Sequence, residues 1–147
     1  MESRWSDREA EEYKAHFAPR SGEELALRVY TSRLIGRDPD LVMHGGGNTS
    51  LKGTVTTLLG DRVEALFVKG SGWDLDAIEP PGLPAVDLAH LRRLRTLSTL
   101  SDEEMVNQLR THLFDVGAPN PSVETLLHAF LPHRFIDHTH ADITLVL

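Results

Sequence analysis

The stretch that decides the fold is Ala65-Leu66-Phe67-Val68-Lys69-Gly70-Ser71-Gly72. Its first four residues are all apolar, and a short continuous apolar run predicts a strand that is buried on both faces. Two glycines follow closely, and the carboxyl ends of buried strands are where α/β folds bind their ligands. Lys69 and Ser71 could contact a phosphate group there, although the same residues are equally typical of a plain turn.

Helical and strand patterns alternate on both sides of this stretch. Helices are predicted at residues 23–34 and 102–114, because apolar residues recur there at helical spacing. Strands are predicted at residues 54–59, and at residues 135–138 leading into residues 143–147. Breaks rich in Gly and Pro lie at residues 36–39, 79–84 and 117–121. This interleaving predicts an α/β fold.

Three predicted helix starts carry a Ser followed three residues later by a Glu, which is the pattern of a capping box. The pairs are Ser6 with Glu9, Ser21 with Glu24, and Ser101 with Glu104. In each pair, we expect both side chains to accept N–H groups that have no partner within the helix.

The composition is that of an ordinary globular domain. The chain has 147 residues, 40% hydrophobic and 25% charged, which is enough for one domain with its own core. The formal net charge is −7, and the nearest approach to a basic tract is Arg92-Arg93 with Arg95, which we interpret as a solvated helix face. Nucleic-acid binding needs a concentrated basic footprint, so we expect no nucleic-acid partner.

Cysteine and membrane signals are absent from the sequence. Without cysteine, the chain has no disulfide, thiolate metal site or cysteine nucleophile. Its first residues form no apolar secretion segment, and no apolar run approaches the ~18–20 residues that span a bilayer. We therefore expect a cytoplasmic protein without a membrane partner.

The sharpest chemical signal is His138-Thr139-His140. Residues i and i+2 of a strand point to the same face, so both imidazoles could reach one metal ion, for which zinc is the best fit. The competing interpretation is a pair of surface histidines on an edge strand. Asp137 or Asp142 could orient a ligand imidazole, but each is more typical of a strand cap or a solvated carboxylate.

A second signal is His44-Gly45-Gly46-Gly47-Asn48-Thr49-Ser50. Three glycines let the backbone approach a ligand closely and point N–H groups at an anion, and the three polar residues add side-chain hydrogen bonds. The spacing matches neither a Walker A loop nor a dinucleotide fingerprint. A flexible turn is the alternative interpretation.

A third signal is Pro121-Ser122-Val123-Glu124. Asn120 or Ser122 could cap a helix, whose exposed N–H groups attract an anion. Glu124 in its first turn is either a carboxylate that complements the helix dipole or a general base. The other histidines are more typical of surface or structural positions: His16, His90, His112, His128 and His133.

Taken together and in this order, these segments resemble the class II aldolase/adducin family over residues 21–147. The beginning of the chain and the glycine-rich segment look closest to the aldolase half of bifunctional rhamnulose-1-phosphate aldolase/short-chain dehydrogenase proteins. The resemblance implies a single αβα-layered domain over residues 1–147, a homotetramer, and zinc held by three histidines. It implies cleavage of a sugar phosphate to dihydroxyacetone phosphate and an aldehyde.

The resemblance also assigns roles to individual residues. His138 and His140 match zinc ligands, and Glu124 matches the acid/base glutamate. The phosphate-binding positions are Gly47, Asn48, Ser71, Gly72 and Ser122. We expect the glutamate and both histidines to converge on one cleft, with Asn48 and Ser71 at its other end.

The family's third histidine is expected beyond Leu147, so the resemblance predicts a domain truncated at its C-terminus. The apolar ending of the chain, residues 143–147, also resembles a buried strand that is cut at its end. We therefore expect little zinc binding or aldol cleavage from these residues alone. Two alternatives stay open: a non-catalytic adducin-like interaction domain or inactive remnant, and a sugar-phosphate epimerase.

Overall fold

A computed structural model describes residues 3–43 and 45–140 of the chain. Two compact units make up the structure, and each is described by itself. Unit 1 contains Met1–Gly47, Trp73–Pro80 and Asp137–Leu147, and unit 2 contains Asn48–Gly72 and Pro81–Ile136. Helices and strands interleave along the chain, which confirms the predicted mixed α and β class.

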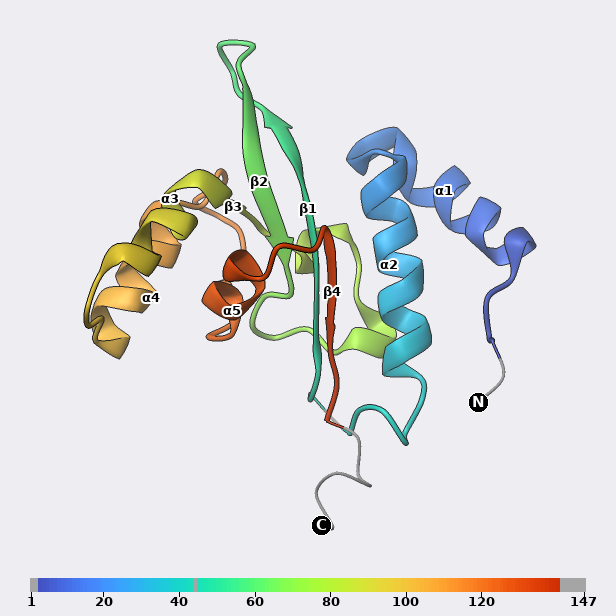
Figure 1. Ribbon diagram of the computed structural model, residues 1–147. Coiled ribbons are helices and arrows are strands. Elements are labelled where there is room, and N and C mark those ends of the chain that lie inside the picture. Colours follow the sequence, from blue (N-terminus) through green and yellow to red (C-terminus); the bar gives the residue numbers. More distant parts are fainter. Residues whose placement is uncertain (1–2, 44, 141–147) are drawn as a thin grey trace. The chain divides into compact units, whose positions relative to one another are not determined.

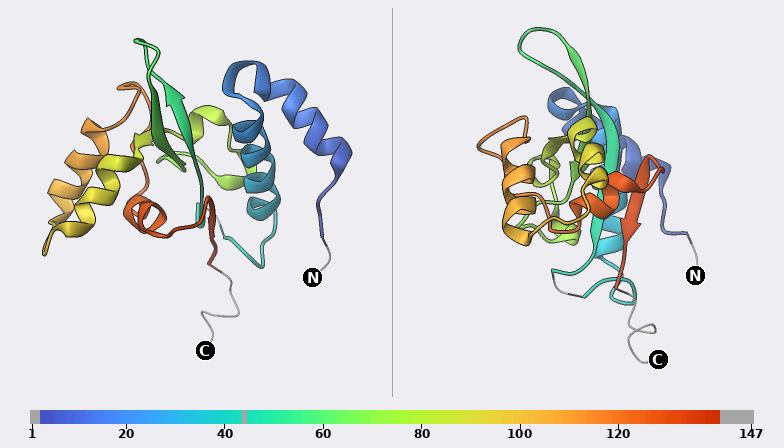
Figure 2. Two further views of the ribbon diagram at one scale, coloured as in Figure 1. Left: turned by 45° about the horizontal axis from the view of Figure 1, so that its top comes forward. Right: turned by 60° about the vertical axis from the view of Figure 1, so that its left-hand side comes forward.

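Unit 1 is built on two helices, α1 (Asp7–Ser21) and α2 (Glu23–Gly36), which run side by side in opposite directions (Figures 1 and 2). Gly22 joins them with φ 83°, a conformation that favours glycine. The helical spacing predicted an apolar stripe of Leu25, Val29 and Leu34 beside Tyr30. Leu25, Val29 and Tyr30 are buried, and Leu34 is half-buried. A 3₁₀ turn, η1 (Leu75–Ala77), lies so close to Gly36 that a side chain would not fit there.

The helix starts only partly follow the predicted capping boxes. Ser6 and Ser101 accept the N–H groups of Glu9 and Glu104, as predicted. The prediction for Ser21 is wrong, because this residue ends α1 and its hydroxyl donates to the Phe17 carbonyl at 2.7 Å. With no residue between the helices except Gly22, Ser21 is one position too early to cap α2.

Unit 2 contains a sheet whose strand order is β3-β2-β1-β4. Its strands are β1 (Asn48–Thr56), β2 (Arg62–Val68), β3 (Ala85–Asp87) and β4 (Phe135–His138), the last ending in unit 1. The pairs β1–β2 and β2–β3 are antiparallel. The sequence argument for the turn after β2 used the rule that ligands bind at the carboxyl ends of strands, and that rule was derived for parallel sheets.

The first strand begins earlier than predicted. We expected it at residues 54–59, but β1 starts at Asn48, inside the polar part of the glycine-rich segment. Leu58 and Leu59 instead form the exposed tip of the hairpin between β1 and β2 (Figure 1). Pairing with the apolar strand β2, in register from Ser50 opposite Val68, explains why polar residues continue the strand.

Three short helices complete unit 2: α3 (Leu88–Arg93), α4 (Asp102–Thr111) and α5 (Thr125–Phe130). Two 3₁₀ turns, η2 (Pro80–Gly82) and η3 (Leu94–Thr96), lie before β3 and after α3. One core joins the helices to the sheet, made of Leu66, Val68, Val86, Leu88, Leu91, Leu109 and Ala129. Ala65, Leu66 and Val68 are buried, as predicted for the strand that decides the fold, whereas Phe67 is half-buried.

Helix α4 ends at Thr111 rather than at the predicted residue 114. Leu113 leaves the helix because its backbone forms a bridge to Val86 in β3. The predicted strand at residues 143–147 lies outside the described residues, as does Asp142. In the part of the chain that the structure describes, no helix combines the length and apolar character needed to cross a membrane.

Candidate active site

Two imidazole rings face each other at the end of β4. His138 is the last residue of the strand, and His140 follows it outside the strand. Their Nε2 atoms are 3.1 Å apart, and their ring centroids are 4.8 Å apart. The His140 N–H donates to the Leu41 carbonyl at 3.0 Å. Because the strand ends at His138, this backbone contact, and not strand alternation alone, sets the position of the second ring.

The separation of the two Nε2 atoms fits the requirements of a metal ion. In a tetrahedral site with metal–nitrogen bonds of about 2.0–2.1 Å, two imidazole nitrogens lie about 3.3 Å apart. The 3.1 Å separation is close to this distance, and imidazole donors suit zinc and similar divalent ions. Two imidazoles provide two of the three protein ligands that a catalytic zinc site normally has.

Gly47 lies directly against this histidine segment within unit 1. Its φ is 73°, and a Cβ there would lie 2.4 Å from Val42 Cγ1 and 3.1 Å from the His138 carbonyl oxygen. A Cβ on Gly46 would be 3.6 Å from His140 Nδ1. The glycines therefore let the backbone pass close to both histidines, while His44 lies outside the described residues.

Glu124 is held by two side chains of unit 2. Asn48 Nδ2 donates to Glu124 Oε2 at 2.9 Å, and the Ser122 hydroxyl lies 3.5 Å from the same oxygen. Asn48 is 1% exposed and begins β1, so this contact ties the carboxylate to the sheet. The half-buried Glu124 is thus oriented by neutral hydrogen-bond donors.

The position predicted for Glu124 within a helix is wrong by one residue. Helix α5 begins at Thr125, and Glu124 is its N-cap, without a side-chain cap hydrogen bond. Ser122 accepts the Glu124 N–H at its hydroxyl, 3.1 Å away, and the Thr125 N–H at its carbonyl, also 3.1 Å away. These two contacts form a tight turn that precedes the helix.

The segments around Ser71 and Ser122 run side by side in unit 2. The Ser71 N–H donates to the Asn120 carbonyl at 2.8 Å, and the Ser122 N–H donates to the Lys69 carbonyl at 3.1 Å. The N–H groups of Ser122, Glu124 and Thr125 have partners within the protein, whereas the sequence predicted exposed N–H groups at this helix start. The side-chain hydroxyls of Ser71 and Ser122 can still contact a ligand.

A cavity of about 230 Å³ lies beside these hydroxyls. Ser71, Asn120 and Ser122 line it together with Arg110, a basic residue that the sequence reading did not single out. Ser71 and Gly72 are exposed, and Gly72 has φ 82° with nothing within 4 Å of a Cβ. Gly72 is therefore favoured by its backbone conformation.

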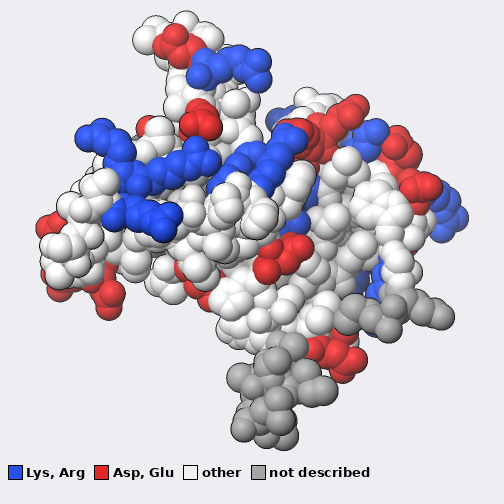
Figure 3. Space-filling model, in the orientation of Figure 1, with Lys and Arg blue, Asp and Glu red and all other residues white. Residues whose placement is uncertain are grey.

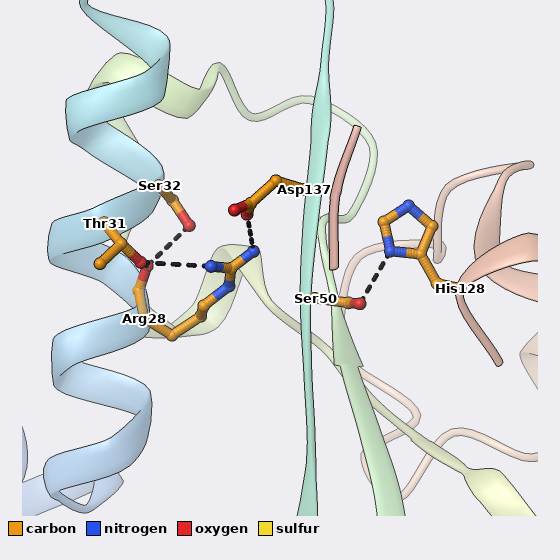
Figure 4. A network of polar contacts seen from close by, with 6 residues as sticks. All are labelled: Arg28, Thr31, Ser32, Ser50, His128 and Asp137. Carbon is orange, nitrogen blue, oxygen red and sulfur yellow. Dashed lines mark hydrogen bonds and ion pairs between the residues drawn. The ribbon is translucent and has the colours of Figure 1, made fainter. Parts of the chain in front are cut away.

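Thr49 and Ser50 do not present groups to a ligand, contrary to the expectation from the sequence. Both are fully buried in β1. Ser50 Oγ lies 2.7 Å from Nδ1 of buried His128 (Figure 4). This contact satisfies two polar groups within the core of unit 2, and it confirms the structural role expected for His128.

The predicted site residues are therefore divided between the two units. Gly47, His138 and His140 belong to unit 1, where the structure brings them together. Unit 2 contains Asn48, Ser71, Gly72, Ser122 and Glu124. Within unit 2, direct contacts join Asn48 and Ser122 to Glu124.

Sequence reasoning missed two buried basic residues. Arg28 is 4% exposed within the apolar face of α2, and its guanidinium contacts the Asp137 carboxylate (Figure 4). Lys52 is 8% exposed, and its Nζ donates to the carbonyls of Leu131 and His133. The signal for Arg28 was a charged residue flanked by apolar ones in a predicted helix, whereas Lys52 lies outside the strand predicted at residues 54–59.

Burial and charge act on Lys52 in the same direction. Burial lowers the pKa of Lys52, and the neighbouring positive charge of Arg92 lowers it further. Arg92, Arg93 and Arg95 are exposed, and basic side chains gather over α3 (Figure 3). This arrangement matches the solvated helix face that the sequence predicted for this arginine cluster.

Comparison with known proteins now identifies the family. Residues 26–147 match the family described as Class II Aldolase and Adducin N-terminal domain. The chain is 44% identical over 124 residues to the uncharacterized oxidoreductase YuxG of Bacillus subtilis (strain 168), covering 84% of this chain. A solved structure of the N-terminal class II aldolase domain of a conserved protein from Thermoplasma acidophilum matches with a TM-score of 0.83 and 39% identity.

The chain belongs to the class II aldolase/adducin family. It spans 18% of the length of the Bacillus relative. The Thermoplasma match covers 99% of this chain and 63% of that structure. Family membership supports a metal-dependent, aldolase-type function and a lyase-type enzyme.

Proposed function

We propose that this domain is the catalytic part of a zinc-dependent aldehyde-lyase that cleaves a sugar phosphate of the L-rhamnulose 1-phosphate type. Its products are dihydroxyacetone phosphate and an aldehyde. The observation that carries the proposal is the pair of facing imidazoles, with Nε2 atoms 3.1 Å apart, in a member of the class II aldolase family.

In this proposal, His138 and His140 hold the zinc ion, together with a third ligand that is not among the residues described. Zinc, when bound, supplies Lewis-acid stabilisation of the negative charge that develops on the substrate oxygens. Imidazole donors and their separation support this assignment over an ion that prefers oxygen ligands.

Glu124 is proposed as the acid/base residue. Breaking the carbon–carbon bond leaves negative charge on the carbon next to the carbonyl group, and this carbon must gain a proton. The hydroxyl on the carbon that becomes the aldehyde must lose a proton in the same reaction. We assign Glu124 to carry this proton: its carboxylate takes it up from that hydroxyl and then gives it to the carbon next to the carbonyl, and the reverse reaction uses the same transfers in the opposite order. The contacts from Asn48 and Ser122 support this role, because they fix the carboxylate in one orientation without neutralising its charge.

The phosphate group is assigned to Gly47, Asn48, Ser71, Gly72 and Ser122. Exposed Ser71 and half-buried Ser122 border the cavity in unit 2, so their hydroxyls can donate to a phosphate oxygen. Binding at this remote end of the substrate holds the reacting carbons in place. The family also supports a homo-oligomer, which we extend to the tetramer proposed from the sequence.

The Bacillus relative is named an oxidoreductase, and its matched segment is a small part of its length. We propose that a chain of that kind combines the aldolase-type domain with an oxidoreductase part. The aldehyde released by the first part would then be a chemically suitable substrate for the second.

The test measures dihydroxyacetone phosphate released from L-rhamnulose 1-phosphate, with and without added zinc. It compares the 147-residue chain with a longer protein that contains it. In the active form, Glu124→Gln should abolish most turnover while zinc content and product binding stay unchanged. Glu103→Gln, an exposed glutamate in α4, is the matched control and should keep full activity.

Asn48→Ala provides a second measurement. It should weaken binding of the phosphorylated sugar and, because Asn48 also holds Glu124, lower kcat.

An epimerised sugar phosphate in place of dihydroxyacetone phosphate would overturn the proposed reaction. Turnover that is independent of zinc would overturn the proposed metal.

A further inference from the structure

An ion pair between a buried arginine and a half-exposed aspartate connects the histidine segment to α2 within unit 1. Arg28 lies in the middle of α2, is 4% exposed, and contacts the carboxylate of Asp137. Asp137 directly precedes His138 in β4. The second guanidinium nitrogen of Arg28 donates to Thr31 Oγ1 at 3.3 Å, which fixes the plane of the group (Figure 4).

Burying the guanidinium of Arg28 is an energetically unfavourable way to stabilise a helix. Removing a guanidinium from water carries a large desolvation cost, and an apolar side chain of similar size often stabilises a core as well or better. Burial lowers the pKa of Arg28, while the charge of Asp137 acts in the opposite direction. The specific consequence of the pair is therefore geometric, because it fixes where the Asp137 side chain lies.

Two contacts hold the histidine segment, one at each of its ends. The Arg28–Asp137 pair holds it immediately before His138, and the bond from the His140 N–H to the Leu41 carbonyl holds it at the other end. Both anchors belong to α2 or to the segment that follows it. The 3.1 Å separation of the imidazole nitrogens depends on the backbone between these two anchors.

We propose that Arg28 is a positioning residue that, through Asp137, sets the distance and orientation of the two imidazoles for a divalent metal ion. The inference rests on the proposed function, in which His138 and His140 hold that ion. It adds a role for Arg28, which lies on α2, and this role requires no direct contact between Arg28 and either imidazole ring.

The test measures Zn²⁺ affinity by competition with a chromophoric chelator, and the Co²⁺ absorption spectrum as a report of coordination geometry. Arg28→Met in a longer protein that contains these 147 residues should weaken Zn²⁺ binding about tenfold, the lower end of the usual effect of losing an outer partner of a metal ligand. The Co²⁺ spectrum should change in intensity as well.

Arg33→Met is the matched control. Arg33 lies on the same helix and donates to the Ile78 carbonyl at 2.8 Å, with Glu79 3.8 Å away, so its loss removes the same charge without touching the histidine segment. Its Zn²⁺ affinity should stay within about twofold of wild type. Arg28→Lys should recover part of the affinity, because the charge remains but the planar fork is lost.

Zn²⁺ affinity of Arg28→Met equal to wild type would overturn this inference alone. If the longer wild-type protein binds neither Zn²⁺ nor Co²⁺, the proposed function fails, and this inference fails with it. If circular dichroism shows that Arg28→Met does not fold, Asp137→Asn tests the pair from its half-exposed side. The same weakening is expected there, and an unchanged affinity would refute the positioning role.

Discussion

At the scale of single residues, Gly47 combines two constraints that other glycines satisfy separately. Its φ of 73° disfavours any side chain, and its Cβ position is already filled by Val42 Cγ1, 2.4 Å away. Gly60 has φ 90° but nothing within 4 Å of a Cβ. The glycine-rich segment is thus required by packing against the histidine segment and not merely by flexibility.

Gly47→Ala should therefore destabilise the protein more than Gly60→Ala. A side chain in the left-handed conformation alone lowers stability by about 1–2 kcal/mol, and this loss applies to both variants. Gly47→Ala adds a collision with Val42 and the His138 carbonyl, so its total loss should exceed that of the control by about 1–3 kcal/mol. Urea unfolding of the three proteins measures the difference, and equal losses would contradict the packing explanation.

The residue types of the candidate site could be read from the sequence, but their environments could not. The spacing of His138 and His140 predicted that both imidazoles point to one face of a strand, and their Nε2 atoms lie 3.1 Å apart. The polar run after Gly47 suggested three ligand-binding side chains, yet Ser50 turns to buried His128. Which polar group has a partner inside the core depends on residues distant in sequence, and no local pattern encodes that choice.

At the scale of elements, Tyr30 joins the two helices of unit 1. Its hydroxyl accepts the Ser6 N–H at 2.9 Å and donates to Glu9 Oε2 at 3.1 Å. Its ring also lies 5.0 Å from the rings of Trp5 and Tyr13. The Glu9 carboxylate therefore binds Tyr30 and not the Ser6 N–H that a capping box would assign to it.

Tyr30→Phe should lower the stability of unit 1 by about 1–2 kcal/mol at neutral pH, because the Ser6 N–H and the Glu9 carboxylate lose their partner. Equilibrium urea unfolding measures the change. Tyr13→Phe removes a hydroxyl that makes only 3.4 Å contacts, to Arg33 and Arg37, and should cost less. The opposite order of the two variants would show that the hydroxyl of Tyr30 does not join the helices.

Lys52 links β1 to the segment after α5 in unit 2. Lys52→Met should cost about 1 kcal/mol at neutral pH, since the Leu131 and His133 carbonyls lose a donor. Burial lowers the pKa of Lys52 in the folded state, so wild-type stability rises as the pH increases from that lowered value toward 10.5. The difference in unfolding free energy between wild type and Lys52→Met should therefore widen at alkaline pH, and a constant difference would contradict this role.

Element type was more predictable than element boundaries. The apolar stripe of α2 and the buried strand β2 follow directly from hydrophobic spacing. The start of β1 at Asn48 and the end of α4 at Thr111 were not predictable, because pairing with β2 and β3 decides them. A capping-box pattern such as Ser21 with Glu24 does not give the correct helix start where a single glycine connects two helices.

At the scale of the whole molecule, each unit contains a buried group whose titration is expected to change stability at alkaline pH, and the two changes have opposite signs. Burial raises the pKa of Tyr30 in unit 1, so its contribution is complete below pH 10.0 and is lost as the pH rises above this value. The lowered pKa of Lys52 in unit 2 adds stability over the range that ends at 10.5. Both tryptophans, Trp5 and Trp73, belong to unit 1.

Tryptophan emission should therefore report the unfolding of unit 1, whereas far-ultraviolet circular dichroism reports both units. In urea titrations, we expect the midpoint from the emission maximum to fall relative to the midpoint from circular dichroism as the pH is raised from 7 to about 10.5, because coincident transitions require a single cooperative structure. Tyr30→Phe removes the titrating hydroxyl and should suppress most of this divergence, while Tyr13→Phe should leave it in place. Midpoints that coincide at both pH values in wild type would show that the two units unfold as one, and would rule out separate alkaline responses.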